Sequence, residues 1–313
     1  MPYVSREFKS SDTNAPALSG LTPGSVIQVL KAVLVNGYGD KTALGWDLMY
    51  EDISNHICVF RPKTGSRMFL QIIDDGKTEA RYAFAYSWES MFDAVTGVHK
   101  MPTSNSTAMI FKTVKTSGTT ESSWTIIGDE VGFYFLIQPN IQGAANVRLR
   151  RSIMYVGEGI VLGDTSFTTP YNWLQMTAQT NYYYPQPHFM RNPKTQTAGY
   201  MTQSSDWWCS VTTEGDITVA GRQTNGTIAG VIGYEPVYLK FYNYNTYEIN
   251  VPGMFVPILP VPSHQYRLGE EWYEEIDKKN KLFCFPVLGQ RYTNANEEYR
   301  AAILIGDRFR HVF

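Results

Sequence analysis

The stretch that decides the fold is GSVIQVLKAVLVNGYGDKTALGW, residues 24–46. Thr22 can cap a helix and Pro23 suits a first helical position, so a helix is expected to begin there. Asn36-Gly37 ends it, because both residues tolerate the left-handed backbone conformation. Between these points, apolar residues recur at the spacing of one helical face, namely Val26, Val29, Leu30, Val33 and Leu34.

The glycines of this stretch decide between a phosphate site and a packing element. A phosphate-binding loop places its glycines before a helix, where backbone N–H groups point at the ligand. Gly37 and Gly39 follow the predicted helix, so they stand at its wrong end. The stretch therefore predicts a helix that packs on a β body, with Trp46 starting the first strand or filling the seam beside it.

Beyond Trp46 the chain consists of short apolar segments separated by turn residues, which is typical of β structure. Asp75-Gly76 and Gly128-Asp129 mark the turns of two expected hairpins. The predicted fold class is mainly β, with sandwich- or barrel-like sheets, one N-terminal α-helix and an extended N-terminal arm. The expected strands lie in HICVFRP, SRMFLQII, ARYAFAYSW, SSWTIIGDEVGFYFLI (two strands), NVRLRRSIMYVGEGIVLGD, WWCSVTT, DITVAG, PVYLKFYNYNTYEIN, KLFCFPVLG and YRAAILIGDRF.

The predicted organisation has four parts. Residues 1–20 are polar and are expected to form an extended arm that orders on a neighbouring subunit. Residues 21–163 form a helix-plus-β domain, and residues 164–206 form an irregular aromatic segment. Residues 207–313 form a second β portion, either in the same domain or in another. A second, short helix is expected near Glu270 to Asp277.

Composition argues against binding driven by charge. The chain has 313 residues, a formal charge of −2 and an isoelectric point near 6.2, so no global field attracts nucleic acid or an anionic membrane. Charged residues make up only 18%, whereas 14% are aromatic, with 21 Tyr. Tyrosine suits half-buried surfaces, so this composition favours sheets and subunit contacts.

Three cysteines, Cys58, Cys209 and Cys284, lie far apart and without CxxC spacing. They predict reduced, buried thiols and not a disulfide framework or a zinc site. The opening MPYVSREFKSSD has no apolar core of a signal peptide, and no apolar run reaches the ~18 residues of a membrane span. Synthesis and folding in a reducing cytoplasm are expected.

Catalytic and cofactor motifs are weak throughout the sequence. GEGIVLG, residues 157–163, starts as a GxG motif, but its third glycine is one residue late and a strand and turn are the better interpretation. A zinc pair of His56 and Cys58 is weaker than two packed side chains. No G-x-S-x-G motif occurs, and adjacent acids such as Asp74-Asp75 are typical of solvated turns. No enzyme, cofactor or metal is predicted.

Two groups of residues are candidates for binding. The run RLRRS places Arg148, Arg150 and Arg151 together, which favours salt bridges across a subunit interface over nucleic-acid contacts. The second group is aromatic and is either a glycan- or partner-binding surface or the anchor of a long loop. It comprises Tyr182, Tyr183, Tyr184 and Phe189, with His188 among them, followed by Trp207 and Trp208.

Several segments together resemble a family of structural proteins in the virions of tailed bacteriophages. The opening APALSGLTPGSVIQVLKAVLVNGYGDKTALGW resembles the N-terminus of that family. Further similarity follows in VFRPKTGSRMFLQIIDDG, ARYAFAYSWESMFDAVTG, WTIIGDEVGFYFLI, VPGMFVPI and RAAILIGDRFR, whereas residues 164–235 carry no such motif. None of these motifs is catalytic.

The resemblance implies a non-enzymatic virion component at the capsid surface, the neck or collar, or the tail. Its implied partners are copies of itself and other virion proteins, with no membrane and no specific nucleic acid. Two alternatives remain open: a tail-associated protein that binds a receptor or a host-surface glycan, and a virion-associated glycan hydrolase with a carboxylate pair assembled by the fold.

Overall fold

The computed structural model describes residues 4–77, 81–113, 121–139, 152–163, 173–179, 182–191, 198–201, 234–241, 244–257, 271–273, 281–286 and 300–305. The chain divides into two compact units. The N-terminal unit comprises Arg6–Glu158 and Phe167–Thr202, and the C-terminal unit comprises Met1–Ser5, Gly159–Ser166 and Gln203–Phe313. Antiparallel sheets make up most of the described chain, so the predicted mainly β fold class is confirmed.

The first sheet of the N-terminal unit runs in the order β1-β9-β10-β11-β13-β14-β15, with β2 also paired to β9. Its strands are β1 (Arg6–Lys9), β2 (Leu18–Ser19), β9 (Glu121–Gly128), β10 (Gly132–Pro139), β11 (Ser152–Glu158), β13 (Trp173–Gln179), β14 (Tyr182–Arg191) and β15 (Ala198–Met201). The predicted hairpin at Gly128-Asp129 joins β9 to β10. There the Asp129 carboxylate accepts hydrogen bonds from the backbone N–H groups of Val131 and Gly132, both at 3.0 Å.

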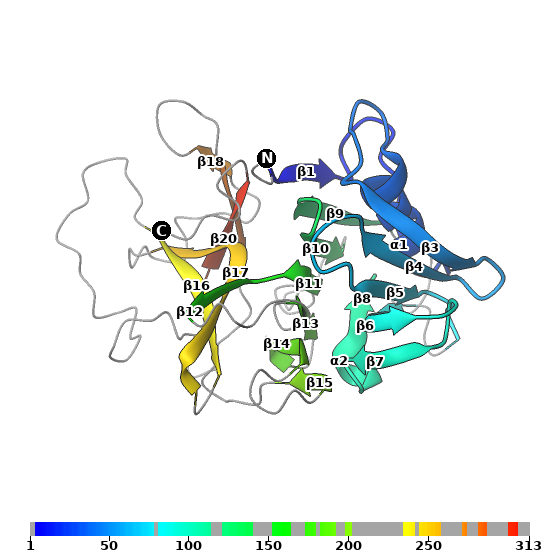
Figure 1. The fold of residues 1–313 in the computed structure, drawn as a ribbon. Coiled ribbons are helices and arrows are strands. Elements are labelled where there is room, and N and C mark those ends of the chain that lie inside the picture. The colour runs from blue at the N-terminus through cyan, green and yellow to red at the C-terminus, as the bar shows by residue number, and fades with distance from the viewer. Residues whose placement is uncertain are drawn as a thin grey trace. The chain divides into compact units, whose positions relative to one another are not determined.

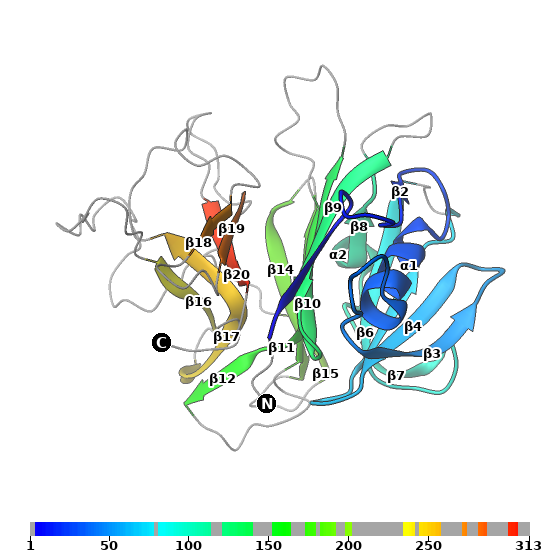
Figure 2. The same ribbon diagram turned by 90° about the horizontal axis from the view of Figure 1, so that it is seen from above.

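The second sheet runs in the order β3-β4-β5-β6-β7, with β8 also paired to β6. Its strands are β3 (Trp46–Asp52), β4 (Ile57–Pro62), β5 (Phe69–Ile73), β6 (Tyr82–Met91), β7 (Gly97–Met101) and β8 (Met109–Phe111), with the short helix α2 (Asn105–Ala108) before β8. Asp75-Gly76 lies in the β5–β6 connection, as predicted. The two sheets lie face to face, with helix α1 between them (Figure 1, Figure 2), and β8 contacts β11 and β13 directly.

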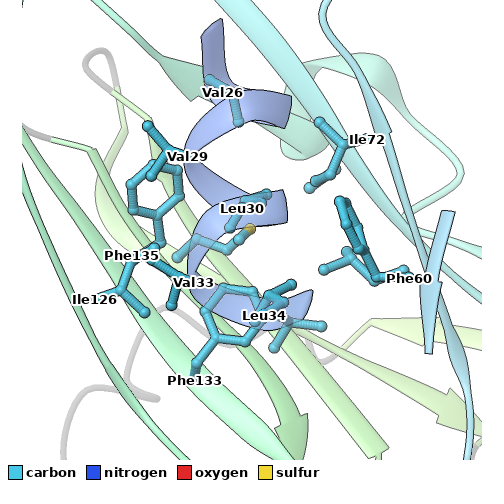
Figure 3. Packing of buried hydrophobic residues seen from close by; sticks show 14 of the residues in the cluster. Val26, Val29, Leu30, Val33, Leu34, Phe60, Ile72, Ile126, Phe133 and Phe135 are labelled. Atoms are coloured by element: carbon cyan, nitrogen blue, oxygen red, sulfur yellow. The ribbon is translucent and has the colours of Figure 1, made fainter. Parts of the chain in front are cut away.

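The helix of the opening stretch fills the space between the two sheets. It consists of α1 (Ser25–Leu30), which continues without a break into the π-helical turn η1 (Lys31–Asn36). Figure 3 shows the helix between Phe60 and Ile72 of the second sheet and aromatic or aliphatic residues of β9 and β10 in the first. The five residues of the predicted stripe are fully buried, namely Val26, Val29, Leu30, Val33 and Leu34. Burying each side chain stabilises the fold by about 1.5–3 kcal/mol.

The start of this helix differs from the prediction. Gly24, and not Thr22, is the N-cap residue, and its φ of 78° lies in the left-handed region that favours glycine. No side chain within the helix caps the first turn. Instead the carboxylate of Asp74, at the end of β5, accepts a hydrogen bond of 2.9 Å from the backbone N–H of Val26. The prediction failed because a cap supplied from a distant strand leaves no local signal.

The end of the helix lies where it was predicted, but its last turns are wider. Gly37 donates its N–H to the carbonyl of Ala32, five residues back, as in a π-helix. The next two carbonyls, of Val33 and Leu34, accept hydrogen bonds from Leu44 and Gly45 at 2.8 and 2.9 Å. The chain therefore folds back along the helix end and delivers Trp46 to the core, where it is buried at the start of β3.

The N-terminal arm is extended, as predicted, but from Arg6 onward it belongs to the protein's own first sheet. Both β1 and β2 pair with β9, and Phe8 and Leu18 are buried in the core. The indole of Trp124 also donates a hydrogen bond of 3.0 Å to the Pro16 carbonyl. The expectation that this arm orders on a neighbouring subunit is therefore wrong for its described residues, because the apolar surface it buries is within the same chain.

The segment predicted as irregular, residues 164–206, contributes three strands, β13, β14 and β15. Polar residues on β13 hid this pattern. Gln175 lies on the inward face, where its amide bonds the Ser87 hydroxyl at 2.8 Å and the Ala85 carbonyl at 2.7 Å across the sandwich. A strand is recognised in a sequence by apolar residues on its inward face. Here a hydrogen-bonded Gln175 occupies such a position, so β13 lacks that pattern.

The C-terminal unit contains a third sheet in the order β12-β17-β20-β19-β18, with β16 also paired to β17. Its strands are β12 (Ile160–Gly163), β16 (Tyr234–Phe241), β17 (Tyr244–Pro257), β18 (Glu271–Tyr273), β19 (Lys281–Pro286) and β20 (Arg300–Ile305). The expected short helix at Glu270 to Asp277 is wrong for residues 271–273, which pair as a strand with β19. The expected strands at 207–220 lie outside the described residues.

Candidate functional site

The buried carboxylate of Asp74 is the strongest candidate for a catalytic group, and its contacts make it structural. Its partner is the ammonium of Lys112, 2.6 Å away, and both side chains are completely buried. Lys112 also donates to the Thr22 carbonyl at 2.9 Å, while Asp74 caps the helix through Val26. Burial raises the pKa of Asp74 to about 6, although the Lys112 charge and the Val26 N–H oppose that rise. The pair thus clamps the helix to the second sheet.

Other reactive side chains are also inert in this fold. Burial raises the pKa of the Cys58 thiol to about 12, so Cys58 carries no reactive thiolate. Burial lowers the pKa of His188 to about 4, so that imidazole is neutral at ordinary pH. His56 precedes β4 in a left-handed conformation (φ 51°) and does not share a strand face with Cys58. Within the described ranges, no cluster of three or more His, Cys, Asp or Glu side chains could hold a metal ion.

The predicted binding residues fall in three places. Arg148, Arg150 and Arg151 lie outside the described residues, as do Trp207 and Trp208. Tyr182, Tyr183 and Tyr184 form the start of β14, and only the backbone of these three residues is described. Phe189, also on β14, is fully buried, which is a core position and not an accessible binding surface. Of the Tyr, Phe and Trp residues of the predicted aromatic group, only the side chain of Phe189 is described, and it lies in the core.

The structure instead exposes a different set of apolar side chains, in the connection between β6 and β7 and at the start of β7. Phe92, Val95 and Val98 are exposed by 67%, 54% and 38%. We call residues 92–98 the apolar turn. Exposed apolar groups that gather in one place are typical of interaction sites, whereas single ones are common on any surface.

Polar residues hold the apolar turn in one conformation. The Asp93 carboxylate accepts hydrogen bonds from the N–H groups of Val95 and Thr96, both at 2.7 Å, and from the Thr96 hydroxyl at 2.6 Å. These bonds lower the pKa of Asp93, so its charged, accepting form is favoured. From β5, the amide of Gln71 donates to the Ala94 carbonyl at 2.6 Å. The turn is therefore preorganised, which reduces the entropy lost when a partner binds.

A salt-bridge cluster fixes the base of the turn to the first sheet. Arg191 of β14 donates to both carboxylate oxygens of Glu89 of β6, at 3.0 and 2.9 Å, and the imidazole of His99 lies 2.7 Å from the same carboxylate. Burial raises the pKa of Glu89, but the hydrogen bonds from Arg191 and His99 outweigh it and lower that pKa overall. The bidentate contact joins the two sheets beside the apolar turn.

Sequence reasoning missed this turn as a site, although its signal was present. The letters MFDAVTG place Asp before a short turn and surround it with apolar residues. Nothing in that pattern says that Phe92 points to solvent, because the register of β6 with β7 decides it. Comparison of the chain with family models, with curated proteins and with solved structures returned no match. None of the described helices is long and apolar enough to cross a membrane.

Proposed function

We propose that this protein is a non-enzymatic structural component of a tailed-phage virion, which acts through contacts with other subunits at the capsid surface, the neck or collar, or the tail. The resemblance of its N-terminal motifs supports the assignment to a particle. The observation that carries the assembly role is the rigid apolar turn, which exposes Phe92, Val95 and Val98 on a preorganised backbone. Protein interfaces are typically centred on such aromatic and aliphatic anchors.

The mechanism proposed is docking without chemistry. Phe92 inserts into an apolar depression of a neighbouring subunit, and Val95 and Val98 exclude water around it. Because the Asp93 bonds and the Glu89–Arg191 pair already hold the turn, binding orders few further groups. In a particle with many identical copies, modest contacts of this kind add up through multivalency.

The two other functions predicted from the sequence receive less support. A glycan-binding role rests on Trp207, Trp208 and the β14 tyrosines, whose side chains lie outside the described residues. A hydrolase requires a pair of available carboxylates. The sequence assigns no particular pair to this role, and one buried acid, Asp74, is committed to the clamp with Lys112.

The test is incorporation into particles. Particles produced with the double variant Phe92→Ser and Val95→Ser should contain at least about tenfold fewer copies of the protein, measured by quantitative mass spectrometry of purified particles. Ile53→Ser is the matched control, because Ile53 is an apolar residue exposed by 76% in another turn of the same sheet. Absence of the wild-type protein from particles, or normal incorporation of the double variant, contradicts the proposal.

A further inference from the structure

The outward face of the second sheet carries a row of alternating charged and aromatic residues. The residues that face each other across neighbouring strands are Asp47 and Arg61, then Phe69 and Trp88, and then Trp88 and Lys100. Arg61 is the last residue but one of β4 and Phe69 begins β5, and the Arg61 guanidinium lies 5.2 Å from the centre of the Phe69 ring. This row is on the face opposite Phe60 and Ile72, which pack against the helix (Figure 3).

The rings of this row hold the two cations in place. The Lys100 ammonium lies 4.6 Å from the ring centre of Tyr86 and 5.6 Å from that of Trp88. A cation over an aromatic face is attracted by the negative centre of the ring. Phe69 and Trp88 are only 8% and 9% exposed, so their faces are already covered. The outward contact surface of the row is therefore cationic and not aromatic.

The side chains of Arg61 and Lys100 form no ion pair or hydrogen bond with any described residue, and the Arg61 Nε atom is buried without an acceptor. Two more cations, Lys63 and Arg67, lie in the connection between β4 and β5. Two acids lie near this group: the Asp47 carboxylate is 3.7 Å from the Lys63 ammonium, and the Glu158 carboxylate accepts a hydrogen bond from the Ser66 N–H in the β4–β5 connection. A protein with a formal charge of −2 thus carries a local concentration of positive charge here.

We propose that this cationic row, formed by Arg61 and Lys100 with Lys63 and Arg67 beside them, binds an acidic, extended segment of a neighbouring protein. Arg61 offers a guanidinium fork that matches a carboxylate, and Lys100 offers a second, separate charge. Their strands are separated by three inter-strand steps, or about 14 Å, which equals about four residues of extended chain. An acidic segment with carboxylates at that spacing reaches both cations.

Single-stranded nucleic acid fits this surface less well. Proteins that bind single strands stack the bases on open aromatic faces. Here the cations occupy the ring faces, and a stacked base would have to displace Lys100 from Tyr86 and Trp88. The assignment of the acidic partner to the virion rests on the proposed function, but the binding of an acidic segment stands on the row alone.

The test uses the full-length protein and a fluorescein-labelled peptide of ten glutamates, with binding followed by fluorescence anisotropy. The wild-type protein should bind this peptide, and added salt should weaken the binding. The double variant Arg61→Gln and Lys100→Gln should bind at least about tenfold more weakly, which corresponds to loss of charge-assisted contacts. Lys77→Gln is the matched control, because Lys77 is an exposed cation in a different connection, where it bonds Asn55. The affinity of this variant for the glutamate peptide should stay within about twofold of the wild-type affinity.

A melting curve confirms that each variant is folded before it is compared. The inference is overturned if the glutamate peptide does not bind, if ten glutamines bind equally well, if the double variant binds as the wild type does, or if ten thymidine nucleotides bind more tightly. If the peptide does not bind but the wild-type protein is found in particles, the proposed function stands and only the inference on the cationic row is lost. Absence of the protein from particles removes the virion assignment without changing the peptide result.

Discussion

Two regions of the N-terminal unit reverse the usual distribution of residues, one by burying charges and the other by exposing an aromatic side chain. They differ in whether the fold supplies partners for these residues. Asp74 and Lys112 are charged and completely buried. Phe92 is apolar and 67% exposed. The first region satisfies itself: the carboxylate and the ammonium bond each other, the Val26 N–H and the Thr22 carbonyl. The second has no apolar cover in the described residues.

This difference separates structural from functional exceptions to the usual distribution of residues. A buried charge is tolerated when it is paired and hydrogen-bonded, as the charges of Asp74 and Lys112 are within the chain. An exposed aromatic on a rigid turn gains nothing from its own fold. The hydrogen bonds within residues 92–98 hold the turn without covering Phe92, which is the basis of the docking role proposed for it.

The largest effect on stability should come from deleting residues 1–20, the N-terminal arm. The deletion removes β1 and β2 and the buried side chains of Phe8 and Leu18. Loss of a buried Phe alone costs about 3–5 kcal/mol, so the truncated protein should unfold well below the wild-type melting temperature or lack a cooperative transition. An unchanged melting temperature contradicts the packing of the arm on its own sheet.

Breaking the clamp should have the next largest effect. Asp74→Ala leaves Lys112 buried without its counter-charge and should lower the free energy of unfolding by about 3–5 kcal/mol, measured by urea denaturation. Lys31→Ala is the matched control, because the Lys31–Glu51 pair at 2.8 Å is partly exposed and worth about 1 kcal/mol or less. Replacing both partners, as Asp74→Leu with Lys112→Met, should recover much of the loss. If the double variant stays as unstable as Asp74→Ala, the ion pair itself stabilises the fold, and the loss is not only the cost of one unpaired buried charge.

The pH dependence of the clamp sharpens the comparison further. Asp74 titrates near 6 in the folded protein against an ordinary value of 3.8, so between these pH values the folded state binds more protons than the unfolded state. Stability contributed by this group is therefore lower above pH 6 and rises as the pH falls toward 4. Between pH 7 and pH 4.5 the wild type should gain about 2 kcal/mol relative to Asp74→Asn. If the wild type loses stability relative to Asp74→Asn as the pH falls from 7 to 4.5, the pKa of Asp74 is not raised in the folded protein.

The smallest effect on stability should come from the apolar turn. Phe92→Ser removes a side chain that is mostly in water already, so the free energy of unfolding should change by no more than about 0.5 kcal/mol. The same variant should impair incorporation into particles. A loss of several kcal/mol in the isolated protein would mean that Phe92 belongs to the fold and not to an interface.

Particular residues show how far the sequence could be interpreted. The stripe from Val26 to Leu34, the helix end near Gly37 and most of the described strands followed from local periodicity, because burial on one face repeats at a fixed spacing. The cap by Asp74 and the strand β13 did not follow, because their polar groups are satisfied by residues 48 to 90 positions away. Long-range hydrogen bonds leave no periodic trace.

The same limit applied to the candidate sites. The aromatic residues from Tyr182 to Phe189 stood out in the sequence, yet Phe189 proved to be buried in β14. Phe92 and the Arg61–Lys100 row did not stand out, because strand register alone brings their members to one turn or one face. Composition identifies residue types that favour binding, but exposure depends on which strand covers them.

By itself, the sequence determined a mainly β chain, a helix with one apolar stripe, and the position of its end, because these depend on spacing within a few residues. Only the tertiary structure decided that the helix lies between two sheets and that its N-terminus is occupied by the protein's own carboxylate. A helix N-terminus attracts negative charge wherever that charge comes from. Here the anion is Asp74, brought from 48 residues away by the pairing of the second sheet.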